Sequence, residues 1–85
     1  MTKETKKVYD VLRNYWKMAR DRRYKFFPKD GYLWLNSSMD NMIKYCALPR
    51  ETILAVLDAL KADSQINYCL HDYDNREYLS FTNNW

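Results

Sequence analysis

The amino-acid sequence predicts an α+β domain in which three helices support a small antiparallel sheet. Two segments between Ser37 and Ile66 show the three- and four-residue periodicity of helices and are separated by a proline. Residues 66 to 82 instead alternate apolar and polar side chains on either side of a turn, which is typical of a β-hairpin. A length of 85 residues and a hydrophobic fraction of 47% suit one domain, residues 1 to 85, with a single core.

The first element expected is an amphipathic helix over residues 2 to 20. Its apolar side chains recur at spacings of three and four and should pack against the other helices; they are Val8, Val11, Leu12, Tyr15, Met18 and Ala19. The lysines and arginines of this segment fall mostly on the solvent-facing side of the helix. This first helix should therefore support the other two.

A basic loop is expected over residues 21 to 31, because the stretch RDRRYKFFPKDG ends on Pro28 and on the only glycine, Gly31. Two interpretations stay open. The loop is a solvated connector whose aromatic side chains cover the core, or it contacts nucleic-acid phosphates. In the second interpretation Tyr24 stacks on a base or sugar, and the charge comes from Arg20, Arg22, Arg23 and Lys25.

A short strand and a capped helix are expected next. Residues 32 to 35, YLWL, form an apolar run that favours a strand. The helix over residues 38 to 46 follows a serine, Ser37 or Ser38, whose hydroxyl can cap the free amides of the first turn. Asp40 in that turn adds a favourable interaction with the helix dipole.

A second helix over residues 49 to 62 should follow after a tight turn. Pro49 disfavours helical geometry at Leu48 but fits the first position of a new helix, where its missing N–H is not needed. The apolar residues of the new helix again form one stripe, consisting of Ile53, Val56, Leu57 and Leu60. Two short helices with facing stripes make a compact helix-turn-helix pair.

Residues 66 to 82 should form a hairpin with one apolar face toward the helices. Apolar side chains alternate with polar ones from Ile66 to Leu70, and again around Leu79 and Phe81. The residues from Asp72 to Asn75 between them are typical of a turn. The expected order of elements is therefore helix, strand, helix, helix, strand, strand.

The charges are distributed unevenly along the chain. Residues 1 to 30 hold ten Lys and Arg against four Asp and Glu, whereas residues 31 to 62 hold three of each sign. Residues 63 to 85 hold one cation and four anions. This asymmetry indicates a surface for nucleic acid or another polyanion near the N-terminal part of the fold.

The sequence lacks the residue patterns of a catalytic or metal site. His71 lies beside Asp72, but no cysteine or serine nucleophile accompanies it, which argues against an enzyme. Asp72, Asp74 and Asn75 resemble the start of a calcium loop, but the glycine and the distal glutamate of such a loop are missing. We therefore expect no catalytic residue, no metal and no cofactor.

A cytoplasmic location without a membrane segment is expected. The sequence has no apolar run near ~18 residues, and the start MTKETKKVYD lacks the apolar segment of a signal peptide. Cys46 and Cys69 do not have the spacing of a metal or redox pair, so both are interpreted as reduced packing residues. An intermolecular disulfide is the alternative.

The order of these elements resembles the winged helix-turn-helix family over nearly the whole chain. The segment from Gly31 to Tyr68, GYLWLNSSMDNMIKYCALPRETILAVLDALKADSQINY, is similar to modules of bacterial, plasmid and phage replication initiators and of small transcriptional regulators. In those modules a strand precedes the motif, and a small apolar turn occupies the position of Ala47 and Leu48. A Pro-Arg-x-Thr-Ile segment, here beginning at Pro49, opens the recognition helix.

The resemblance implies a homodimer that binds double-stranded DNA in transcription control or in replication of a mobile element. The recognition helix would enter the major groove, where Arg50 suits guanine and Glu51 can accept from cytosine. The turn over residues 71 to 77 would be the wing that touches the backbone or the minor groove. The candidate DNA-contacting residues are Arg50, Glu51, Thr52, Ser38, Lys44, Arg20, Arg22, Arg23, Lys25 and Arg76.

A second function stays open, in which a winged helix docks a protein partner. The outer face of the recognition helix also holds Leu54, Ala55 and Asp58, and the wing is acidic. Leu54 and Ala55 form either an apolar patch for a partner or a surface that faces the wing. Such a module would bind a basic partner through the apolar and acidic face of this helix.

Overall fold

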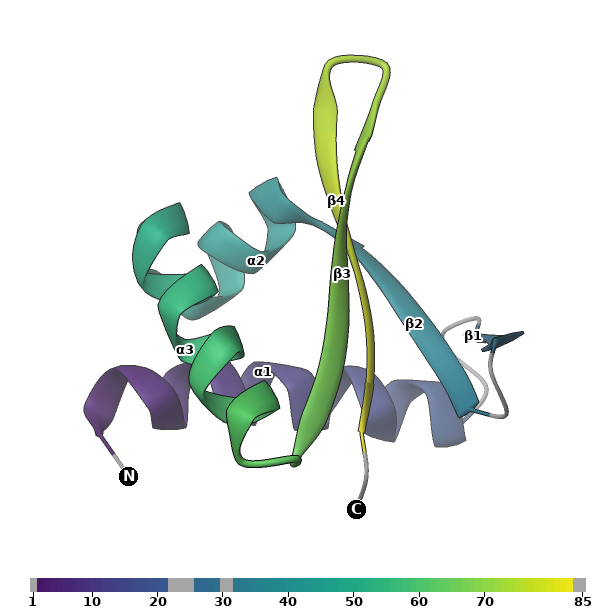
Figure 1. Ribbon diagram of the computed structural model, residues 1–85, viewed down its shortest axis with the longest axis horizontal. Helices are drawn as coiled ribbons and strands as arrows, with labels where there is room; N and C mark the ends of the chain where they lie inside the picture. Colours follow the sequence, from purple (N-terminus) through teal and green to yellow (C-terminus); the bar gives the residue numbers. More distant parts are fainter. Residues whose placement is uncertain (1, 22–25, 30–31, 84–85) are drawn as a thin grey trace.

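The computed structural model describes residues 2–21, 26–29 and 32–83, with the backbone alone for residues 26–29, 32 and 33. It is an α+β fold in which three helices pack on an antiparallel sheet (Figure 1). The helices are Lys3–Arg20 (α1), Met39–Cys46 (α2) and Arg50–Ala62 (α3). The strands are Phe26–Lys29 (β1), Tyr32–Ser38 (β2), Ile66–Tyr73 (β3) and Arg76–Asn83 (β4). The fold class, the three helices and the antiparallel sheet expected from the sequence are confirmed.

The corner between α2 and α3 forms because local signals end one helix and begin the next. The hydroxyl of Ser38 accepts a hydrogen bond from a backbone amide of the first turn, so Ser38, and not Ser37, caps α2. α2 ends where Ala47 takes the left-handed conformation, with φ at 55°. Pro49 is extended and precedes α3, which begins at Arg50, one residue later than expected.

The sheet has four strands in the order β1-β2-β4-β3, one more strand than expected. The prediction of a loop over residues 21 to 31 is wrong for residues 26 to 29, which form β1 and pair antiparallel with β2. Pro28 is compatible with this position because β1 is an edge strand, where one side of the backbone needs no partner. β2 also extends past the expected residues 32 to 35, and its last residues pair with β4 up to Ser38.

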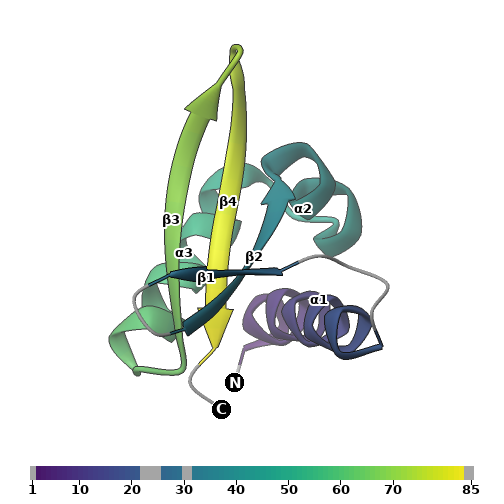
Figure 2. The same cartoon turned by 90° about the vertical axis from the view of Figure 1, so that its right-hand side faces the viewer.

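β3 and β4 form the expected hairpin, which projects beyond the helices (Figures 1 and 2). Tyr73 pairs with Arg76, so the connection consists of two residues, Asp74 and Asn75. Both have positive φ, at 53° and 62°, as in the tight turn that matches the twist of two paired strands. Asp and Asn tolerate this conformation better than most residues.

The core lies between the helices and one face of the sheet. Helical side chains such as Leu12, Met42 and Leu57 are fully buried together with Leu79 and Phe81 of β4. The ring of Tyr15 packs edge-on against the ring of Phe81, with centroids 5.6 Å apart. Each of these side chains belongs to a stripe that the periodicity of the sequence predicts.

The opposite face of the sheet is also buried around β2 and β4. Trp34, Ser80 and Thr82 point away from the helices and are nevertheless no more than 4% exposed. The hydroxyl of Ser80 donates a hydrogen bond of 2.6 Å to the side-chain oxygen of Asn36. The sequence predicts that only one face of the hairpin is buried, because polar residues such as Ser80 and Thr82 alternate with apolar ones. The structure shows that both faces of the sheet are buried at these positions.

Candidate nucleic-acid interface

The solvent-facing side of α1 carries a run of cations along its whole length. The buried residues of α1 share one stripe of the helix, from Val8 to Ala19. At 3.6 residues per turn, six exposed Lys and Arg fall on the other side, and we call this surface the basic stripe. The basic stripe consists of Lys3, Lys6, Lys7, Arg13, Lys17 and Arg20. One exposed acid, Asp10, lies among these cations. The helix has 18 residues and is therefore about 27 Å long.

Of the basic stripe, only Arg20 belongs to the predicted DNA-contacting set. The other five cations are not in that set, because the prediction weighted the helix-turn-helix motif and the loop before it. A signal for them exists in the sequence. The same periodicity that identifies the buried side of α1 also places its cations on one face.

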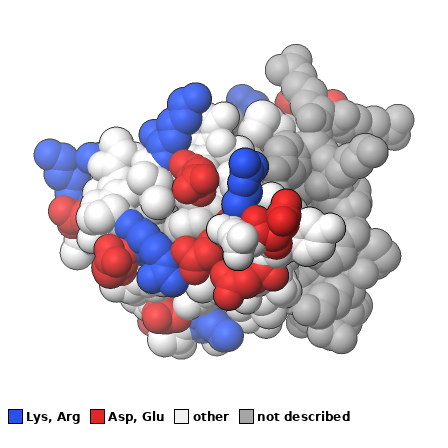
Figure 3. Space-filling model, turned by 90° about the horizontal axis from the view of Figure 1, so that it is seen from above, with Lys and Arg blue, Asp and Glu red and all other residues white. Residues whose placement is uncertain are grey.

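The acidic hairpin tip lies at the other end of the molecule from α1 (Figures 1 and 2). Around the turn, Asp72, Asp74 and Glu77 outnumber Arg76. Figure 3 views the molecule from this end and shows cations and anions intermixed among the coloured residues. The predicted wing and the basic stripe therefore do not share a surface, which the sequence alone could not establish.

Arg50, the predicted guanine reader, is held by the hairpin. Its guanidinium donates two hydrogen bonds to the carboxylate of Glu77 on β4, of 2.7 and 2.8 Å. This ion pair raises the pKa of Arg50 and, mainly through the hydrogen bonds, lowers the pKa of Glu77. The planar fork of the arginine is matched to the carboxylate in this bidentate arrangement, so base reading by Arg50 requires the pair to break.

A second contact joins α3 to the hairpin further along the helix. The hydroxyl of Tyr68 on β3 donates a hydrogen bond to the carboxylate of Asp58. Burial of the ring, together with this bond, raises the pKa of Tyr68 to about 12. Leu54 lies between the two contacts along the helix and packs against the core. Arg50, Leu54 and Asp58, one turn apart, thus form the side of α3 that faces the hairpin.

The remaining exposed surface of α3 is short of hydrogen-bond donors. The side away from the hairpin carries Glu51, Ala55, Ala59 and Ala62, all exposed. Direct reading of bases in the major groove uses the donors and acceptors of side chains such as Arg, Lys, Asn and Gln. Among the described residues on this side of α3, only Glu51 and the half-buried Thr52 carry polar side chains. The structure therefore offers little for sequence-specific reading by α3.

The other residues of the predicted set are dispersed. Ser38 caps α2, so its hydroxyl already has a partner. Lys44 is exposed on α2, with its ammonium 5.9 Å from the ring centroid of Tyr45. Arg76 is exposed at the hairpin tip among acids. Arg22, Arg23 and Lys25 lie outside the described residues.

The described residues offer little support for a reactive cysteine, a metal site or a membrane-spanning helix. Cys46 is buried, and burial raises the pKa of its thiol to about 11, against the opposing charge of Lys7. This thiol is therefore protonated and unreactive at neutral pH. Among the described residues, no three His, Cys, Asp or Glu gather closely enough to hold a metal ion. Within the same residues, no helix has both the length and the apolar character needed to cross a bilayer.

The Arg50–Glu77 ion pair predicts a pH dependence of stability. Because the pKa of Glu77 is lowered in the folded state, the pair stabilises the fold above the ordinary glutamate pKa of 4.5, and this contribution disappears as pH falls through the lower folded value. Glu77→Gln should therefore lower the urea midpoint at neutral pH, and this loss should shrink as the pH is lowered further below 4.5. The control is Glu4→Gln, which removes an exposed acid from the first turn of a different helix, α1. A loss for Glu77→Gln that stays equal as the pH is lowered would contradict the prediction.

Comparison with protein-family models finds no matching family, and comparisons with curated proteins and with solved structures find no match. The functional conclusions therefore rest on the residues and the geometry of this chain. The strongest feature is the basic stripe of α1, on the other side of the molecule from the acidic hairpin tip.

Proposed function

We propose that this chain is a winged-helix domain that binds double-stranded DNA through the basic stripe of α1. The observation that carries the proposal is the placement of six exposed cations on one side of an 18-residue helix. A strand before the helix pair and a hairpin after it also agree with the winged-helix arrangement. A role in transcription control or in replication of a mobile element is part of the same proposal.

The geometry of the basic stripe suits the phosphate backbone better than the bases. Lys and Arg along about 27 Å of helix can meet a series of phosphates, of which each strand presents one per ~3.4 Å of duplex axis. Each phosphate that is neutralised releases condensed counterions, and this release drives binding without regard to sequence. Because Arg50 is paired and the exposed side of α3 is poor in donors, the proposal is binding with little sequence preference.

A salt titration of the intact chain on duplex DNA tests this proposal. The measurement is the dissociation constant by fluorescence anisotropy at salt concentrations from about 50 to 200 mM. If four or more phosphates are contacted, the logarithm of the association constant should fall linearly with the logarithm of the salt concentration. The slope should be roughly −3.6 or steeper, at about −0.9 per contact. No binding at the lowest salt, or a slope near zero, would overturn the proposal.

The exposed side of α3 favours a second candidate, the docking of a protein partner. Glu51, Ala55, Ala59 and Ala62 form a small, slightly acidic surface on which another element can approach closely. A charged, bulky substitution such as Ala55→Arg should abolish this docking while leaving the fold and DNA binding unchanged. Failure to bind DNA by a folded chain, together with binding of a basic peptide that Ala55→Arg abolishes, would favour this candidate over the first.

A further inference from the structure

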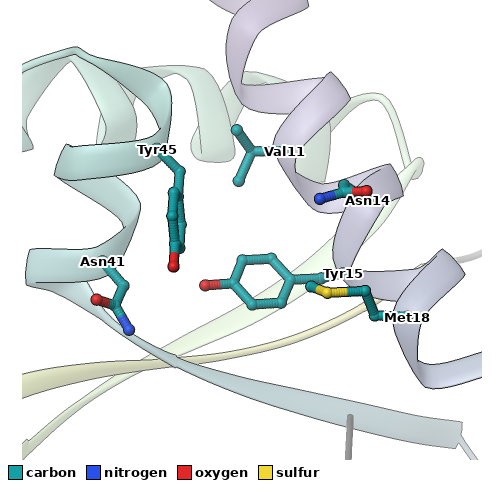
Figure 4. A pocket seen from close by; sticks show the side chains of 6 residues that line it. All are labelled: Val11, Asn14, Tyr15, Met18, Asn41 and Tyr45. Carbon is teal, nitrogen blue, oxygen red and sulfur yellow. The ribbon is translucent and has the colours of Figure 1, made fainter. Parts of the chain in front are cut away.

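A groove between α1 and α2 adjoins the basic stripe (Figure 4). It has a volume of about 490 Å³, within the usual range for ligand-binding pockets. Val11, Asn14, Tyr15 and Met18 line it from α1, and Asn41 and Tyr45 line it from α2. None of these six residues belongs to the predicted DNA-contacting set.

Two tyrosines give the groove an aromatic wall. The ring of Tyr15 is 3% exposed, and its hydroxyl shares a 2.7 Å hydrogen bond with the hydroxyl of Ser37 in β2. The ring of Tyr45 meets it edge-on, with centroids 6.4 Å apart and an interplanar angle of 70°. Tyr45 is nevertheless 57% exposed as a residue, so it is accessible to a ligand.

Polar groups stand beside this aromatic wall. Figure 4 shows the side chains of Asn14 and Asn41 bordering the same space as the two rings. Both residues are exposed, and each amide carries donors and an acceptor that suit the hydrogen-bonding edge of a nucleobase. Aromatic surface together with amide groups is a combination that reads an unstacked base.

Cations flank the groove on both helices. On α1, Asn14 occupies the same side of the helix as Lys3, Lys7 and Lys17 of the basic stripe. Lys7 is close enough to α2 for its charge to act on the thiol of Cys46. On α2, the ammonium of Lys44 lies 5.9 Å from the ring centroid of Tyr45. Three exposed acids, Glu4, Asp10 and Asp40, are also near this surface, so the four cations outnumber the acids by one.

We propose that this groove binds an unpaired base of single-stranded nucleic acid while the neighbouring cations hold its phosphates. Tyr45 supplies the stacking surface, and Asn14 and Asn41 supply hydrogen bonds to the base edge. Flat aromatic surfaces inside basic grooves are the common means by which proteins hold single strands without strong sequence preference. The inference rests on the proposed function, because it assigns to the basic stripe a second nucleic-acid substrate.

The test compares Tyr45→Ala with a matched control, Tyr73→Ala. Both tyrosines are exposed, at 57% and 73%, but Tyr73 lies on the hairpin, far from the groove. The probe is a fluorescein-labelled oligo(dT) of about 15 nucleotides, a length within the range that single-strand binding folds cover. Loss of one stacked base predicts that Tyr45→Ala weakens binding by roughly 5- to 150-fold, whereas Tyr73→Ala leaves it unchanged.

A duplex of the same length separates this inference from the proposed function. Tyr45→Ala should leave duplex binding unchanged, because paired bases remain stacked on one another and do not enter the groove. If oligo(dT) binding is equal for Tyr45→Ala and the intact chain while the duplex still binds, the groove has no role and the proposed function stands. If the duplex does not bind but Tyr45→Ala still weakens oligo(dT), the proposed function fails and the groove is a single-strand site. Tight binding of an uncharged peptide with no binding of oligo(dT) would overturn the inference in favour of a protein ligand.

Discussion

Replacing Lys6, Arg13 and Lys17 together by glutamine is expected to weaken duplex DNA binding by about two to three orders of magnitude near 0.1 M salt. These three exposed residues lie on the same side of α1, with Arg13 and Lys17 one turn apart and Lys6 about two turns before Arg13. If each contacts one phosphate, the salt slope should become less steep by about 2.7, at about 0.9 per contact. The measurement is the same anisotropy titration, with circular dichroism to establish that the helix content is unchanged.

The control for this variant removes two cations that lie outside both the basic stripe and the groove. Lys61 and Arg76 are exposed on α3 and the hairpin, and both are replaced by glutamine. If α1 contacts the DNA backbone, this control should retain most of the affinity for duplex DNA and most of the salt slope of the intact chain. If the control loses as much affinity as the α1 variant, binding depends on net charge or on the hairpin end, and the role of the basic stripe is wrong.

Phe81→Ala is expected to cost about 3–5 kcal/mol of stability. Phe81 is fully buried on β4, pairs with Leu35 on one side and Tyr68 on the other, and packs against the ring of Tyr15. Its truncation therefore leaves a cavity where the sheet meets the helices. A domain of 85 residues has a total stability of about 4–13 kcal/mol, so the variant should be close to unfolding.

Urea denaturation followed by circular dichroism measures this loss. The control is Leu70→Ala on β3, where the side chain is 38% exposed and truncation should cost about 1 kcal/mol or less. A loss below about 1 kcal/mol for Phe81→Ala would mean that the core collapses around the missing ring, contrary to the packing described here.

Local patterns in the sequence were sufficient to predict most of the secondary structure. The spacing of apolar residues located all three helices, and the alternation around Asp74 and Asn75 located the hairpin. These features depend on near neighbours in the chain, such as the serine before α2 and the proline before α3. The sequence did not decide which serine caps α2, because both Ser37 and Ser38 are suitable. The structure shows that the cap is Ser38.

Strand pairing was predicted less completely. β1 was missed because a short FFPK segment among cations has no periodicity of its own, and it becomes a strand by pairing with the edge of β2. The burial of Ser80 and Thr82 was also missed, because polar residues that alternate with apolar ones normally face solvent. Both features depend on segments that meet only in the folded chain.

The sequence by itself determined the elements of the candidate interface, but only the tertiary structure decided which of them can act together. The periodicity of α1 places its cations on one face, because a helix repeats every 3.6 residues wherever it lies. Whether Arg50 is available depends instead on Glu77, 27 residues later, which the hairpin brings within 2.7 Å. A salt bridge between distant segments leaves no local pattern, so the sequence could not show that Arg50 is paired. Among the described residues, the cations gather instead on the solvent-facing side of α1.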